Sequence, residues 1–126
     1  MSATLGFFEQ FKGADTVLLS TNQGELLEMA ERLERFASSR VLFLEIEAVP
    51  ISGHEAHLVA VRESHAPANQ RQFHWLCGPR DIPEILEKLR HLAKSTRGHQ
   101  YFDLLGTNAQ LLVSVGEYRA NALADV

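Results

Sequence analysis

The chain has little of what would mark a specialised class of protein. It contains one cysteine, Cys77, which rules out an internal disulfide and favours a reducing cytoplasm. It has no apolar stretch as long as a membrane span, and residues 1–11 lack the basic and apolar regions of a signal peptide. We therefore expect a cytoplasmic protein that has no membrane partner.

Positive charge is also in short supply. The 12 Lys and Arg residues are outnumbered by 16 Asp and Glu residues, which gives a net charge of -4. Nucleic-acid binding normally requires a basic stripe, so we expect no nucleic-acid partner. Mild acidity suits a basic protein partner, although solubility alone would also account for it.

The chain does contain an internal repeat. Its 126 residues, 45% of them hydrophobic and 22% charged, fit a single globular domain over residues 1–126. A constant offset of 56 positions, which sets Val17 against Phe73, lays the second half (about 71–117) on the first (about 14–63). Five identities then fall together, in the pairs Glu28 and Glu84, Glu31 and Glu87, Leu33 and Leu89, Ala37 and Ala93, and Ser39 and Ser95.

The first half is expected to run strand, helix, strand, strand. Residues 16–20 read as a strand, and Asn22 with Glu25 has the spacing of a capping box for a helix that reaches about residue 39. Residues 41–49 are the clearest strand of the chain, and a turn leads from them into a further strand at 56–63.

The second half is expected to repeat this order. A strand at 72–77 precedes a helix that Asp81 can cap, and Gly98 is placed to end that helix in the left-handed conformation. Two more strands follow at 101–105 and 110–115.

The residues before the first half are apolar and short. We expect one or two helical turns over residues 3–12, with Phe7, Phe8 and Phe11 on one face. Packing on the rest of the domain is the favoured explanation for these rings, and burial in a dimer interface is the alternative.

These elements predict an α+β fold. Two βαββ halves would form a mostly antiparallel sheet with two amphipathic helices on one face, after a short N-terminal helical turn. We prefer one six-stranded sheet with pseudo-twofold symmetry. Two separate three-stranded layers are the alternative.

Candidate catalytic or metal-binding groups do not converge in the sequence. His54, His57 and His74 are the alternative metal set, and Cys77 could join them in a small-molecule or metal-dependent enzyme. A spacing of three residues on a strand points side chains to opposite faces, so the sequence favours surface imidazoles and a buried thiol. We therefore expect no metal, no cofactor and no catalytic residues.

Carboxylates on the strand at 41–49 are the best candidates for a binding surface. Leu42, Leu44, Ile46 and Ala48 alternate onto one face, which leaves Glu45 and Glu47 on the other. The pair could serve acid–base chemistry, form the solvated end of a strand or meet a cationic partner. We select as partner-binding residues this pair, Glu63, and the two residues of the equivalent second-half strand: Tyr101 and Asp103.

The last quarter of the chain resembles a known group of proteins. Residues 98–103 and 111–118 form a strand-turn-strand ending that is common among small uncharacterised bacterial proteins, some of them immunity proteins that neutralise secreted toxins. The resemblance implies a cytoplasmic inhibitor, often with an acidic face, and it identifies no functional residue.

The function predicted from the sequence is non-enzymatic protein binding. The partner would be another protein, as for an immunity-type inhibitor, or a second copy of the chain in a homodimer. The enzyme that uses the histidines around the central hairpin is the alternative.

Overall fold

The computed structural model describes residues 3–63 and 71–117 and confirms the α+β class. Within these ranges it contains two helices and eight strands. The elements are β1 (Thr4–Phe11), β2 (Ala14–Thr21), α1 (Gln23–Ala37), β3 (Phe43–Glu45), β4 (Val49–Pro50), β5 (His57–Val61), β6 (Gln72–Leu76), α2 (Ile82–Leu92), β7 (Gly98–Asp103) and β8 (Gln110–Val115).

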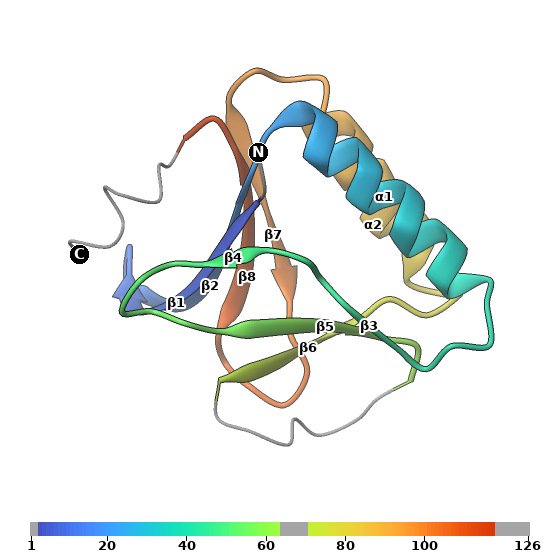
Figure 1. The fold of residues 1–126 in the computed structure, drawn as a ribbon, viewed down its shortest axis with the longest axis horizontal. Helices are drawn as coiled ribbons and strands as arrows, with labels where there is room; N and C mark the ends of the chain where they lie inside the picture. The colour runs from blue at the N-terminus through green and yellow to red at the C-terminus, as the bar shows by residue number, and fades with distance from the viewer. Residues whose placement is uncertain (1–2, 64–70, 118–126) are drawn as a thin grey trace.

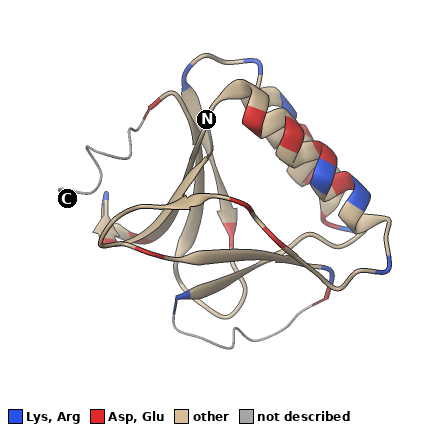
Figure 2. Ribbon diagram, viewed as in Figure 1, with Lys and Arg blue, Asp and Glu red and all other residues tan. Residues whose placement is uncertain are grey.

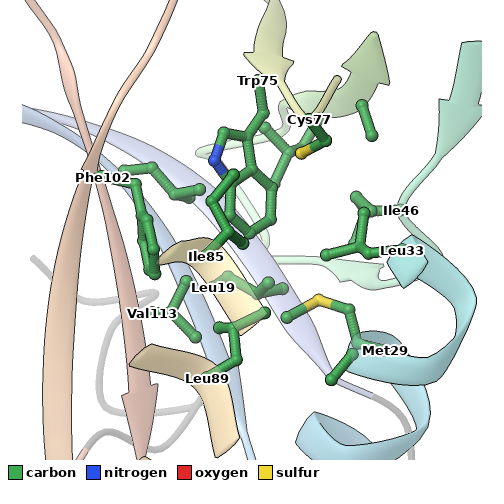
Figure 3. Close-up of a cluster of buried hydrophobic side chains, with 14 of the residues drawn as sticks. Leu19, Met29, Leu33, Ile46, Trp75, Cys77, Ile85, Leu89, Phe102 and Val113 are labelled. Atoms are coloured by element: carbon green, nitrogen blue, oxygen red, sulfur yellow. The ribbon is translucent and has the colours of Figure 1, made fainter. Parts of the chain in front are cut away.

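The strands form two sheets that share one core with the helices. The larger sheet has the order β4-β1-β2-β8-β7, and the smaller has the order β3-β5-β6. The two helices lie side by side and cover the core from one side, while the two sheets enclose it from the others (Figure 1). Side chains of both halves meet in this core, among them Leu19 and Ile46 from the first and Trp75 and Phe102 from the second (Figure 3).

The two βαββ halves are present, and each gives its first strand to the other. Strand β2 of the first half pairs in parallel with β8 of the second, and β6 of the second half pairs in parallel with β5 of the first. The expected antiparallel pairs, β3 with β5 and β7 with β8, lie within the halves. The prediction of one six-stranded sheet is therefore replaced by two sheets, each built from both halves.

The strands of the two sheets pair in the same pattern, which gives the fold a pseudo-twofold axis. Val17 pairs with Leu111 in the larger sheet, and the equivalent Phe73 pairs with Leu58 in the smaller, three positions beyond the residue equivalent to Leu111. The helices meet across this axis, where Arg90 Nη2 lies 3.1 Å from Glu34 Oε1. These two residues are themselves 56 positions apart, so the ion pair joins equivalent points of the two helices.

Helix α1 begins as the sequence predicts. The Asn22 side chain accepts a hydrogen bond from the Glu25 N–H (2.8 Å), and the Glu25 carboxylate accepts one from the Asn22 N–H (2.9 Å). Its predicted buried stripe is also confirmed: Leu26, Met29, Ala30, Leu33 and Phe36 all lie in the core.

Helix α2 begins and ends differently from the prediction. Asp81 occupies the N-cap position, but its backbone is already helical (φ -92°, ψ -29°), and its side chain makes no capping hydrogen bond. Gly98 does not terminate the helix in the left-handed conformation, since it is the first residue of β7. A glycine with positive φ does occur near this end of the helix, but it is Gly116, which follows β8. An added Cβ at Gly116 would lie 2.3 Å from the Thr96 carbonyl oxygen.

The predicted N-terminal helical turn is wrong, because the segment forms strand β1. Lys12 and Gly13 have φ values of 52° and 90°, the two positive angles of a tight hairpin turn, and they fold β1 back on β2. The extended backbone points neighbouring rings to opposite faces of the sheet. The Phe7 ring packs on Phe73 in the main core, with 5.2 Å between the ring centroids. Phe8 lies on the other face, beside Leu18 and Leu112.

The long strand predicted over residues 41–49 is divided between the two sheets. Strand β3 ends at Glu45, and the chain then crosses to the larger sheet, where β4 pairs in parallel with β1. The crossing keeps the expected alternation, with Ile46 buried and Glu45 and Glu47 exposed. Leu42 departs from it: its side chain was expected in the core and is 51% exposed.

The two helix starts provide a matched test of capping. We expect Asn22→Ala to lower the free energy of unfolding by about 1 kcal/mol, because it removes the acceptor that α1 uses. We expect Asp81→Ala to cost less, about 0.5 kcal/mol, since only its charge near the helix N-terminus is lost. Urea denaturation measures both values, and equal losses would contradict this difference between the caps.

Candidate binding clefts beside strand β3

The crossing from β3 to β4 positions the candidate site. The Ile46 N–H still donates to the Leu58 carbonyl in the smaller sheet (2.9 Å), whereas the Val49 N–H donates to the Ala3 carbonyl in the larger one (2.7 Å). Residues 46–48 therefore bridge two sheets and lie opposite the N-terminal half of α1. Two clefts border this bridge.

The first opening, which we call the α1 cleft, has a volume of about 430 Å³. Its apolar lining comes from both sheets and from α1, and includes Leu19, Met29 and Ile46. Its charged lining comprises four carboxylates and one guanidinium: Glu25, Glu28, Glu45, Glu47 and Arg32. The α1 cleft thus combines apolar surface with an excess of negative charge.

The second opening, which we call the β5 cleft, has a volume of about 530 Å³ and borders the bridge beside the start of β5. It shares Arg32 and residues 44–48 with the α1 cleft and adds Glu55 and His57 to the charged or titratable lining. Hydrogen bonds from the backbone N–H groups of Glu55 itself and of Gly53 lower the pKa of the Glu55 carboxyl, so that this group is negative at neutral pH.

Two ion pairs cross the clefts at the surface. The Arg32 guanidinium meets the Glu47 carboxylate through two contacts, of 3.3 Å and 3.4 Å, and Glu45 Oε1 lies 3.1 Å from His57 Nδ1. Both pairs are well exposed, so they contribute little to stability. Figure 2 shows acidic residues along α1 and on the segment that connects β3 with β4, which are the two walls of the α1 cleft.

The predicted partner-binding residues are only partly brought together. Glu45 and Glu47 line both clefts. Glu63 is exposed and follows the end of β5 in the smaller sheet. Tyr101 and Asp103 are exposed on β7, an edge strand of the larger sheet, because the pseudo-twofold axis carries the second-half equivalents of Glu45 and Glu47 to the other sheet.

An exposed apolar run lies beside these carboxylates, and the sequence pattern does not predict its exposure. Val41, Leu42 and Phe43 are 56%, 51% and 48% exposed, and they lead from α1 into the edge strand β3. The alternation of apolar and polar residues suggested a half-buried strand, and this pattern gives no sign that the chain is still turning at Leu42. We call Val41, Leu42, Phe43, Glu45 and Glu47 the β3 surface.

The histidines of the alternative metal set lie in different surroundings. The His54 ring stacks on Phe8 (4.2 Å between centroids), and His57 lies beside Glu45. His74 is buried on β6, with its ring 6.5 Å from that of Phe43. Within residues 3–63 and 71–117, no three His, Cys, Asp or Glu side chains are grouped so that they could hold a metal ion.

Cys77 is enclosed by the main core. Its side chain is fully buried beneath the helices, and this burial, together with the charge of Asp81, raises the pKa of its thiol far above neutrality. A protonated, inaccessible thiol is neither a nucleophile nor a metal ligand. The structure therefore supplies no activated cysteine at this position.

Comparison with known proteins found no matching family model, no matching curated protein and no matching solved structure. The resemblance of the last quarter to immunity proteins remains an expectation. Neither of the helices in the described part of the chain is long and apolar enough to cross a bilayer.

The environment of Cys77 predicts its reactivity. In the native protein we expect no labelling by a thiol-specific disulfide reagent over hours at pH 8, because the thiol stays protonated and covered. Addition of a denaturant should expose the thiol and give one equivalent of labelling. Rapid stoichiometric labelling without denaturant would show that the core opens around this residue or that its thiol is ionised.

Proposed function

We propose that the chain is a non-enzymatic protein that acts in the cytoplasm by binding a protein partner through the β3 surface. An immunity-type inhibitor, which covers the active site of a toxin, is the kind of protein this describes. A second copy of the chain is the other partner to test.

The observation that carries the proposal is the exposed apolar run at an edge strand. Three consecutive large apolar residues, each about half exposed, are more than the scattered apolar residues of an ordinary surface. Glu45 and Glu47 adjoin them, so an apolar centre has an acidic rim, as in protein interfaces. The pairing of β3 with β5 occupies one edge of β3 only, which leaves its other edge outside the sheet.

The charge of the rim indicates the character of the partner. Glu45 pairs with the exposed His57 ring, and Glu47 pairs with Arg32. A partner with a basic surface would be attracted by the net charge of the whole chain and by this rim. This is the complementarity expected of an acidic inhibitor and a cationic target.

The test is quantitative capture of partners from extracts of the source cells, with the tagged chain and four variants. Phe43→Ser and Glu45→Lys alter the β3 surface. Leu27→Ser and Glu31→Lys are their controls: Leu27 on α1 has the same 48% exposure as Phe43, and Glu31 is also exposed on that helix. We expect each β3-surface variant to lower capture of the partner about tenfold, the effect of removing a central interface residue, and each control to leave it unchanged.

Sedimentation of the same five proteins tests the homodimer. A dimer that Phe43→Ser dissociates and Leu27→Ser does not would identify the partner as a second copy. A monomeric mass together with no captured protein, or capture that all four variants leave intact, would refute binding through the β3 surface.

A further inference from the structure

The internal repeat provides a comparison for the α1 cleft. At an offset of 56 positions, Leu19, Ile46 and Ala48 correspond to Trp75, Phe102 and Leu104. In the second half all three side chains are buried, and the Trp75 and Phe102 rings lie 5.1 Å apart. In the first half the residues at these positions are smaller and border the α1 cleft, although Leu19 and Ile46 are themselves buried. Larger side chains therefore stand in the second half at the positions whose first-half equivalents border the α1 cleft.

An additional strand, β1, widens the α1 cleft further. In the second half, Leu105 follows the end of β7 and bridges directly to His74 on β6. In the first half, the equivalent segment reaches β1 instead, and β1 lies between it and β2. Adjacent strands lie about 4.8 Å apart, so β1 moves the wall of the α1 cleft outward by roughly one strand spacing.

One carboxylate oxygen of the α1 cleft has no hydrogen-bond partner among the residues that the structure describes. Glu25 uses Oε1 to accept the Asn22 N–H, whereas its buried Oε2 is the oxygen that lacks a partner there. A buried charged acceptor is costly when unpaired, and a cationic donor is the group that relieves this cost. The residues that line the cleft carry four negative charges and one positive charge, which leaves an excess of three negative charges for a ligand to meet.

We propose that the α1 cleft binds the side chain of an arginine from the protein partner, an inference that rests on the proposed function. The aliphatic part of the arginine would lie against Met29, Ile46 and Ala48, and the guanidinium would donate to Glu25 and Glu28. Arg32 shows that a guanidinium suits this wall, because it already contacts both carboxylate oxygens of Glu47 at the mouth. The cleft is continuous with the β3 surface through Glu45 and Glu47, so one partner can reach both.

Arginine fits this cleft better than lysine for two reasons. Its planar fork can donate to two carboxylates at once, whereas an ammonium acts as a point charge. It is also more weakly hydrated, so its transfer into an apolar cleft costs less.

The test is an NMR titration of the full chain with N-acetylarginine amide. The neutral control is N-acetylcitrulline amide, which has the same shape and no charge. We expect millimolar binding that shifts the amides of Leu44, Ile46 and Ala48, with citrulline binding about tenfold more weakly because the charge-assisted hydrogen bonds are lost.

Two variants locate the binding in the α1 cleft. Ala48→Leu introduces the residue found at the equivalent position 104 and should abolish the shifts by filling the cleft. Glu25→Gln keeps an oxygen that can accept the Asn22 N–H but removes the charge, and it should weaken binding about tenfold. Asn22→Ala breaks the cap, leaves the Glu25 charge in place and serves as the control that retains binding.

The outcomes separate this inference from the proposed function. No shifts with the arginine amide, equal binding of citrulline, or full binding by Glu25→Gln would overturn the arginine site even if the β3 surface captures a partner. A second outcome is that the chain binds the arginine amide but Ala48→Leu captures the partner as well as before. That result would show that the occupant of the cleft is not a partner side chain, and a small cationic molecule would be the ligand. Loss of capture in Ala48→Leu, with a native spectrum, supports the inference in full.

Discussion

The exchange of strands between the two halves is the constraint on which the rest of the structure depends. Each half has a helix and an antiparallel pair, but the strand that completes its sheet comes from the other half. A two-stranded hairpin is only marginally stable in water, so neither half can form its sheet alone. The shared core follows directly: α1 and α2 pack on strands that belong to both halves, and Trp75 on β6 reaches the same cluster as Leu19 on β2.

Departures from the pseudo-twofold symmetry produce the candidate site. The N-terminal strand β1 has no counterpart in the described part of the second half, and it separates β2 from the crossing between β3 and β4. Smaller side chains at positions 19, 46 and 48 border the resulting cleft, whereas larger side chains occupy the equivalent positions 75, 102 and 104. The scaffold is therefore repeated, whereas the smaller side chains that border the cleft and the exposed run before β3 are features of the first half.

Local order was predictable because it depends on local signals. The capping box of Asn22 and Glu25, the apolar stripe of α1 and the strand at 110–115 agree with the structure. The pairing of β2 with β8 has no such signal, since its partners lie more than 90 residues apart. The sequence predicts a helical turn before β2, because short apolar runs fit either period; the structure has a strand there and a hairpin turn at Lys12-Gly13.

The candidate site was predictable only where it lies within one segment. Glu45 and Glu47 could be recognised from their alternation along a strand. Arg32 and Glu25 could not, because they come from α1 and meet these carboxylates only through the tertiary fold. Tyr101 and Asp103 were grouped with them by sequence equivalence, but the same symmetry places equivalent residues on different sheets.

Native-state hydrogen exchange in low concentrations of denaturant tests the strand exchange most directly. If each sheet needs strands of both halves, the amides of β2 and β8 and those of β5 and β6 should converge on one free energy of opening, equal to that of global unfolding. Two separate opening energies, with the smaller sheet exchanging while the larger stays protected, would contradict a fold held together by that exchange.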